Sequence, residues 1–435
     1  MRVKYLSFAP LVVLTVSLCP LSSNAQLLWE RTQGFSTESV DFSPDGKRLL
    51  VGSNALDPTE LTIAVYETDT GDEIYGIAEG AHVTSAVFSP DGTLFVEGYF
   101  DGTVRVRDAS TQEVVTTFAG HDSQVFAVDF QPPHGAMVVS GANFGDIKLW
   151  DVATGQNVAT SEFGDGIFAV WDLQFSPDGT RIAAVGSQQV KVWETANLAT
   201  GQEIIALEDA NQGTFEGPES VRWSHDGTML AAGYDEGTIR LWDVASESLV
   251  STLEGHGDEI NSLDFLHTGK VLISGSDDET VRLWDLDTES LVATIEPTVP
   301  FTDCNVSSVR FSPDGSRFAT ADCFDRIALW SSAQWIDVPT SISNYALPTE
   351  VVLAQNYPNP FNPSTAIAYT LDRSGPVQLD VYDLTGRNVS TLVDGVQPAG
   401  RYEIRFGAED LPSGTYVYRL QTGAEVLTRA MTLLR

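Results

Sequence analysis

The chain has 435 residues, of which 24 are Lys or Arg and 60 are Asp or Glu, so its formal net charge is −36 at pH 7. A surface this acidic repels the phosphate backbone of nucleic acids, and we therefore expect no nucleic-acid partner. It could attract basic proteins or divalent cations. The most direct effect of a high net charge is on solubility, however, so a solvated acidic surface is the simpler interpretation.

Residues 1–25 have the features of a secretory signal peptide. Arg2 and Lys4 precede an apolar run, and small residues lead to an expected cleavage after Ala25. The apolar run is too short to span a membrane as a stable helix, so we expect only transient membrane passage. Cys19 could instead mark a lipoprotein signal, but the residues on either side of it argue against that cleavage site.

Residues 26–336 contain seven copies of one unit. Residues 255–285 are the clearest copy, with short alternating apolar runs separated by polar or Gly turns. Such alternation predicts antiparallel strands joined by hairpins. An aromatic residue, here called the recurring aromatic, closes the first run of each copy: Phe42, Phe88, Phe130, Phe175, Trp223, Phe265 and Phe311. A turn of the type Ser-Pro-Asp-Gly follows it in most copies and predicts a tight hairpin.

The copies carry a second shared signal, a Trp-Asp pair at Trp150-Asp151, Trp242-Asp243 and Trp284-Asp285. With these residues the segment resembles the WD-repeat proteins, which form β-propellers, and seven copies imply seven four-stranded blades. In that family one end of the repeat region supplies the outermost strand of the last blade and closes the ring. The segment 27–31 and the segment 335–337 both fit that role, and the sequence leaves the choice open.

The resemblance also implies a structural role for four polar residues. In WD repeats a buried chain of hydrogen bonds links a His, a Ser, an Asp and a Trp, and only one copy has all four: His256, Ser274, Asp278 and Trp284. Such a network fixes the packing of a blade. Ser, His and Asp together would also suit a hydrolase, but acid–base catalysis requires an exposed and reachable site.

The chain changes character after residue 336. Residues 337–350 are rich in Pro, Ser and Asn and are expected to form a linker. In residues 351–435, alternating runs and turns predict a small immunoglobulin-like β-sandwich of seven strands, so the predicted fold class is all-β throughout. The motifs Asn356–Pro363 and Leu411–Tyr416 resemble the type A C-terminal sorting domain of the bacterial type IX secretion system. That resemblance implies a Gram-negative cell, secretion to the surface or the medium, and contact with the secretion machinery; an ordinary adhesion domain is the alternative.

Two cysteines remain after signal cleavage, Cys304 and Cys323. They fall near the places where residues 255–285 have their His and Asp, which the repeat brings together. An exported protein meets an oxidising compartment, so we predict a Cys304–Cys323 disulfide.

No catalytic motif, cofactor-binding loop or metal-ligand spacing occurs in the sequence. We therefore expect an exported, non-catalytic binding or scaffold protein with no cofactor and no bound metal, whose partner is a protein or a glycan. The alternatives are a secreted propeller hydrolase or lyase and a structural component of the cell envelope.

The resemblance also predicts a partner-binding face. In WD repeats the residue four places before the recurring aromatic points to the top rim of the channel, and in two neighbouring copies that residue is aromatic. The predicted top-face residues are Tyr99, Phe100, Phe126, Phe144, Phe168, Trp171, Glu219 and Asn261. A cluster of exposed aromatic rings would mark a binding site. The alternative is that these rings pack inward and replace missing members of the hydrogen-bond network.

Overall fold

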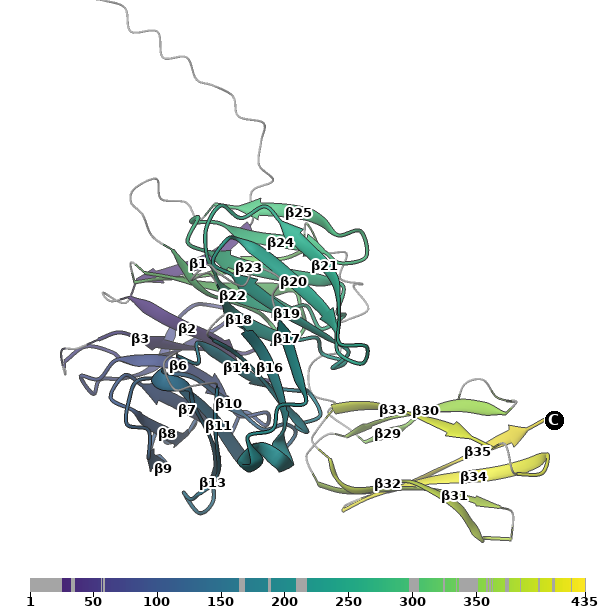
Figure 1. Cartoon of the computed structure of the whole chain (residues 1–435). Coiled ribbons are helices and arrows are strands. Elements are labelled where there is room, and N and C mark those ends of the chain that lie inside the picture. The colour runs from purple at the N-terminus through teal and green to yellow at the C-terminus, as the bar shows by residue number, and fades with distance from the viewer. Residues whose placement is uncertain are drawn as a thin grey trace, which may run out of the picture.

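Seven four-stranded antiparallel sheets form a ring, and a β-sandwich follows it in the chain (Figure 1). The computed structural model describes residues 26–32, 36–55, 57, 59–163, 169–186, 189–208, 217–296, 305–323, 325–333, 335, 351–356, 359, 361, 363–371, 375–383, 385–397, 400–408, 411–423 and 425–434. The predicted signal peptide and linker lie outside these residues. The seven-bladed, all-β prediction is confirmed.

Six blades follow one order, in which each new strand pairs with the strand before it. The first blade has β2 (Thr37–Phe42), β3 (Arg48–Ser53), β4 (Ile63–Glu67) and β5 (Glu73–Ile77). The second has β6 (Val83–Phe88), β7 (Leu94–Tyr99), β8 (Thr103–Asp108) and β9 (Val114–Ala119). The third has β10 (Val125–Phe130), β11 (Met137–Ala142), β12 (Asp146–Asp151) and β13 (Asn157–Glu162), with the 3₁₀ helix η1 (Asn143–Gly145) between its middle strands.

The later blades repeat the pattern. The fourth has β14 (Asp172–Phe175), β15 (Arg181–Gly186), β16 (Gln189–Glu194), the 3₁₀ helix η2 (Thr195–Thr200) and β17 (Ile205–Glu208). The fifth has β18 (Pro218–Trp223), β19 (Met229–Tyr234), β20 (Thr238–Asp243) and β21 (Ser248–Glu254). The sixth has β22 (Ile260–Phe265), β23 (Val271–Ser276), β24 (Val281–Asp285) and β25 (Ser290–Ile295). No helix in the described part of the chain is both long enough and apolar enough to span a membrane.

The two ends of the repeat region meet in the seventh blade. Its strands β26 (Val306–Phe311), β27 (Arg317–Asp322) and β28 (Arg326–Ser331) come from the end of the region, and β1 (Gln26–Thr32) comes from the beginning. Strand β1 pairs antiparallel with β28, so the N-terminal segment supplies the outermost strand and closes the ring. Trp335 instead packs against the core of this blade, with its ring 6.3 Å from that of Phe318.

A Ser-Pro-Asp-Gly turn sets the inner hairpin of four blades, and related Gly-containing turns do so in the other three. In the first blade the Ser43 hydroxyl donates to Asp45 at 2.6 Å and accepts the Arg48 N–H at 2.9 Å. Gly46 closes the turn with φ 69°, a left-handed conformation that glycine adopts without steric cost. The turn is therefore self-contained, which explains why its residues recur from blade to blade.

The hydrophobic core lies between neighbouring blades. One cluster, for example, joins Ile239 and Leu253 of the fifth blade to Leu263, Phe265 and Trp284 of the sixth. A single blade buries little by itself, and stacking the blades in a ring buries both faces of each sheet. The recurring aromatics lie in these inter-blade cores.

The C-terminal module packs a three-stranded sheet against a four-stranded sheet. The first contains β29 (Val352–Leu353), β30 (Ser364–Leu371) and β33 (Gly400–Gly407), and the second contains β32 (Asn388–Gln397), β31 (Gly375–Asp383), β34 (Gly414–Thr422) and β35 (Val426–Leu433). Phe361 lies in the core between them, and buried Asn356 donates through its side chain to Thr365 at 3.0 Å. Asn356 and Phe361 of the first motif are therefore structural parts of the sandwich.

Candidate functional site

The channel has two chemically different ends. The inner strand of each blade begins at one end, close to the loop between the two middle strands, and finishes at the other, at the Ser-Pro-Asp-Gly hairpin. The first end is the predicted top face. The hairpin end was not predicted to carry a site.

Polar residues at the top rim tie neighbouring blades together. Thr84 donates to the Val125 carbonyl at 2.6 Å, and Ser307 donates to the Thr37 carbonyl at 2.6 Å. Asn261 donates through its amide to Asp277 at 2.7 Å and to the Val306 carbonyl at 3.3 Å. These contacts hold the inner strands in register across blade boundaries.

Four aromatic residues of the top face retain accessible surface, and we call them the aromatic rim: Phe100, Phe126, Phe144 and Trp171. The rings of Phe126 and Trp171 lie 4.8 Å apart, and Trp171 is 41% exposed. Phe100 is 46% exposed and stacks on His82 at 5.1 Å, and Phe144 is 57% exposed.

Local contacts connect the turns that carry Phe100 and Phe144. Gly102, with φ 88°, lets the turn of Phe100 lie directly against the Ser123 loop; a Cβ there would meet the Ser123 carbonyl oxygen at 2.9 Å. Ser123 in turn donates to the Asn143 carbonyl at 2.7 Å, at the start of the turn that carries Phe144. The exposed rings of the second and third blades therefore stand on one continuous loop surface.

The prediction for Tyr99 is wrong, because this residue is only 1% exposed. It is the last residue of β7 and points into the blade, where its hydroxyl donates to Glu97 at 2.7 Å. The alternative that Phe144 packs inward is also wrong: its backbone adopts φ 67°, and its ring faces solvent. Phe168 lies outside the described residues. Glu219 is part-buried at the rim, where burial, followed by the charges of Glu259 and Asp235, raises its pKa to about 9.

In the sixth blade four polar side chains form a continuous hydrogen-bond chain. The Trp284 indole N–H donates to Ser274 Oγ at 2.8 Å, and Ser274 Oγ lies 2.7 Å from His256 Nε2. His256 Nδ1 lies 2.8 Å from the Asp278 carboxylate. Burial lowers the pKa of His256. Burial opposes ionisation of Asp278 as well, but hydrogen bonds from His256, Thr280 and the Gly257 N–H lower its pKa well below the ordinary value.

The second blade replaces this chain with a buried ion pair. Arg107 stands in place of the Trp and Glu97 in place of the Ser, and Arg107 Nε lies 3.0 Å from Glu97 Oε1. The Tyr99 hydroxyl donates a hydrogen bond to Glu97, and Glu79 forms a second ion pair with Arg107. The repeat pattern does not predict this pair, because Glu97 and Arg107 lie ten residues apart on two different strands.

Cys323 of the seventh blade is disulfide-bonded. Cys304 lies outside the described residues, so its pairing with Cys323 stays a prediction.

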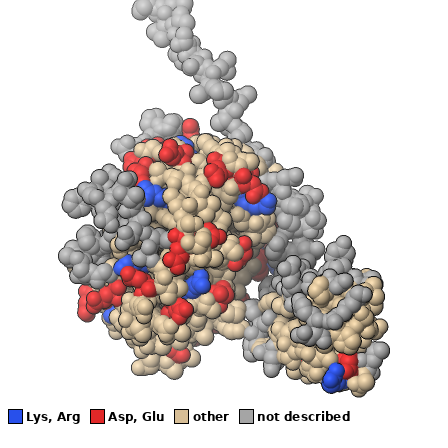
Figure 2. All heavy atoms as spheres, turned by 45° about the vertical axis from the view of Figure 1, so that its right-hand side comes forward, with Lys and Arg blue, Asp and Glu red and all other residues tan. Residues whose placement is uncertain are grey.

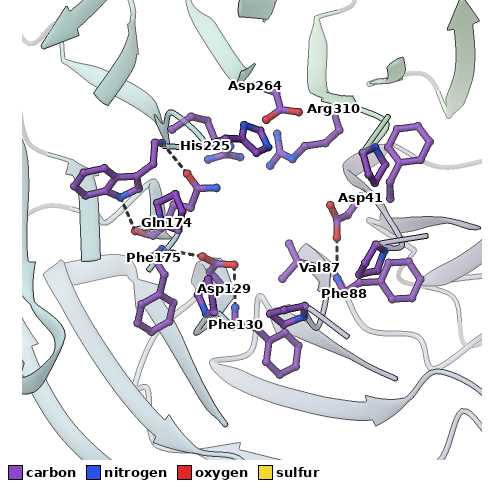
Figure 3. Close-up of a pocket in the computed structure, with 18 of the residues that line it drawn as sticks. Asp41, Val87, Phe88, Asp129, Phe130, Gln174, Phe175, His225, Asp264 and Arg310 are labelled. Carbon is purple, nitrogen blue, oxygen red and sulfur yellow. Dashed lines mark hydrogen bonds between the residues drawn. The ribbon is translucent and has the colours of Figure 1, made fainter. Parts of the chain in front are cut away.

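A cavity of about 380 Å³ opens at the hairpin end of the channel, and we call it the hairpin cavity. It is lined by the residue that precedes each recurring aromatic, namely Asp41, Val87, Asp129, Gln174, Arg222, Asp264 and Arg310 (Figure 3). Its mouth is formed by the second residue of each hairpin, which is Pro44, Pro90, Pro132, Pro177 and Pro313 in five blades and His225 and His267 in two adjacent ones.

Several of the lining side chains hold the next blade. Asp41 accepts the Phe88 N–H at 2.8 Å, and Asp264 accepts the Phe311 N–H at 2.7 Å. In the same way, Asp129 accepts the Phe175 N–H at 2.8 Å, and the Gln174 amide oxygen accepts the Trp223 N–H at 2.8 Å (Figure 3). Burial raises the pKa of Asp41 to about 6 and that of Asp129 to about 7. The signal for this site was in the sequence: polar or charged residues precede six of the seven recurring aromatics.

Among the described residues, no group of three or more His, Cys, Asp or Glu side chains is arranged to hold a metal ion. Figure 2 shows acidic side chains scattered over the propeller face it presents, with basic side chains between them.

Comparison with known protein families agrees with this architecture. Models of the WD domain, G-beta repeat, match residues 247–285 and 292–329. The model of the lipoprotein LpqB beta-propeller domain matches residues 32–252, about half of the chain, and the model of the secretion system C-terminal sorting domain matches residues 355–433. The chain belongs to the β-propeller family and carries WD repeats and a type IX secretion sorting domain. This propeller protein is therefore handled by the type IX machinery and destined for the cell surface or the medium.

Curated relatives match a part of the chain. The chain is 30% identical over 177 residues to the small ribosomal subunit protein RACK1y of Oryza sativa subsp. japonica, covering 40% of this chain and 52% of that protein. It is 32% identical over 180 residues to the WD repeat-containing protein VIP3 of Arabidopsis thaliana, covering 40% and 55%. The chain thus spans about half the length of the curated relatives it matches, and the likeness supports the repeat rather than an activity.

Proposed function

We propose that this secreted propeller protein is a non-catalytic binding protein that captures a protein partner on its aromatic rim. The observation that carries the proposal is exposed Trp171, whose ring packs against that of part-buried Phe126, with exposed Phe100 and Phe144 on the same face. Exposed aromatic rings on an otherwise acidic surface are unusual, and Trp and Tyr dominate the energetics of protein interfaces. Signal-peptide cleavage after Ala25 and a Gram-negative host belong to the same proposal.

The surroundings of the rim favour a partner that carries basic side chains next to an apolar anchor. The part-buried carboxyl groups of Glu38 and Glu219 stand at the same rim. Burial, followed by the charges of Glu259 and Asp235, raises the pKa of Glu219, and a partner cation at this place would offset the charges of those two neighbours. An apolar side chain of the partner would pack against Trp171.

The proposal is tested by affinity capture with the purified full chain from envelope and culture extracts. Trp171→Ala should abolish capture, because it removes the largest ring of the rim. Leu249→Ala is a matched control, since Leu249 is 52% exposed on the outer strand of the fifth blade, away from the rim. If both variants capture the same proteins as the wild type, the aromatic rim is not the binding surface.

A further inference from the structure

The hairpin cavity holds charges of both signs that do not pair with each other. Asp41, Asp129 and Asp264 line it, and so does Arg310. Among the described residues, the ion pairs include Arg222 with Asp172 but none that involves these three carboxylates or Arg310. Arg310 bonds instead to neutral oxygens, including the Val309 carbonyl at 2.8 Å. Unpaired groups of opposite sign thus face one cavity, although a direct ion pair would be the simplest way to satisfy them.

This arrangement disfavours an ion as the occupant. A cation would meet Arg310 and Arg222, which already repel each other: burial, then the charge of Arg222, lowers the pKa of Arg310. An anion would meet the three carboxylates. A neutral molecule that both donates and accepts hydrogen bonds can satisfy both sets of groups without adding charge.

We propose that the hairpin cavity binds a small uncharged saccharide, either free or as the end of a longer glycan. Vicinal hydroxyl groups of a sugar donate to carboxylate oxygens and accept from guanidinium, amide and imidazole N–H groups. Asp41 and Asp264 each use one oxygen on the backbone of the next blade, and among the described residues no group bonds their second oxygen, which can accept from a ligand. This site is separate from the aromatic rim and lies at the other end of the channel.

The size and rigidity of the cavity fit such a ligand. Its volume of about 380 Å³ falls at the small end of the range for ligand sites. Five hairpin prolines form most of the mouth and lose little conformational freedom when a ligand binds, because their rings are already fixed. His225 and His267 replace proline at one side and add N–H donors there.

Titration calorimetry and saturation-transfer NMR on the purified full chain test the proposal. The neutral probes are glucose, galactose, mannose, N-acetylglucosamine and the disaccharide chitobiose, and the charged probes are glucosamine and glucuronate. We expect at least one neutral probe to bind, and to bind more tightly than either charged sugar. Tighter binding of chitobiose than of its monosaccharide would identify the end of a glycan as the natural ligand.

Variants assign the binding to the cavity. Asp41→Asn and Asp264→Asn keep an oxygen for the inter-blade hydrogen bond but replace the second acceptor with a donor, so each should weaken binding about tenfold. Asp45 lies in the hairpin that follows Asp41 but does not line the cavity, so Asp45→Asn should bind as the wild type does. Melting temperatures of all three establish that the propeller remains folded.

The proposal fails if none of the neutral probes binds, if a charged sugar binds best, or if both cavity variants bind as the wild type does. Trp171→Ala separates the two proposals, because it should leave saccharide binding unchanged. Loss of saccharide binding in that variant would contradict the assignment to the hairpin cavity, whereas unchanged protein capture would contradict only the aromatic rim.

Discussion

Replacing Asp278 with Asn tests whether the hydrogen-bond chain of the sixth blade stabilises the propeller. The carboxylate binds His256 Nδ1 at 2.8 Å, accepts the Gly257 N–H at 2.9 Å and accepts the Thr280 hydroxyl at 2.6 Å. Asn retains one acceptor oxygen but loses the charge, and its amide presents hydrogens where the carboxylate presents a second acceptor. Loss of a buried, charge-assisted hydrogen bond costs about 1–3 kcal/mol. For a propeller of this size the cost corresponds to a decrease in Tm of about 2–5 °C.

Asp101→Asn is the matched control within the same chain. Asp101 stands at the equivalent position of the second blade and accepts the Thr103 N–H at 2.9 Å and the Thr103 hydroxyl at 2.6 Å. It is exposed, and no histidine in the described part of the chain bonds to it. The two variants thus disturb the same local turn, and only Asp278→Asn disturbs the buried chain.

Denaturant unfolding of the wild type, both single variants and the double variant His256→Gln/Asp278→Asn measures the effect. We expect Asp278→Asn to be the more destabilising single change and the double variant to show a coupling energy of about 0.5–3 kcal/mol. Equal losses of stability in Asp278→Asn and Asp101→Asn, or strict additivity in the double variant, would refute the reasoning.

Three further predictions concern pH, oxidation and export. Burial lowers the pKa of His121 to about 4. As the pH falls below 6.5, this imidazole is therefore protonated in the unfolded chain, whereas in the folded chain it stays neutral until about pH 4. Relative to His121→Gln, the wild type should therefore lose roughly 3 kcal/mol of unfolding free energy between pH 7 and pH 4, and parallel pH profiles of the two would contradict this. A Cys304–Cys323 disulfide, worth about 3 kcal/mol, should leave no free thiol in the oxidised, unfolded mature protein, and titration of two thiols would exclude it. Deletion of residues 350–435 should leave a folded propeller in the periplasm, and normal amounts of it in the medium would contradict the role of the sorting domain.

The repeat made the architecture predictable from sequence. Period-two alternation and recurring turns specify strands and hairpins locally, and seven copies with the recurring aromatic at one register specify the ring. The closing strand was not predictable in the same way, because residues 27–31 and 335–337 carry similar apolar patterns and only tertiary pairing distinguishes them. The structure pairs the first of these with β28.

The candidate sites were less predictable because they depend on the direction of single side chains. Tyr99 and Phe100 are adjacent in the sequence, yet the strand end turns one inward and the other outward. The pairing of Glu97 with Arg107 crosses from one strand to the next, so neither residue indicates it alone. The hairpin cavity could have been found by comparing the residues that precede the recurring aromatics, since these share one position and differ in charge.

The most direct test of the binding role is photo-cross-linking at the aromatic rim of the exported protein. A benzoylphenylalanine replaces Phe144, which is 57% exposed, in one strain and Val158, which is 50% exposed on the outer strand β13, in another. Irradiation of cells and medium, followed by mass spectrometry, identifies what lies against each position. We predict a discrete cross-linked protein from position 144 that is absent at position 158 and is lost when Trp171→Ala is added. The same cross-links from both positions, or cross-links from position 144 that persist with Trp171→Ala, would contradict capture at the aromatic rim.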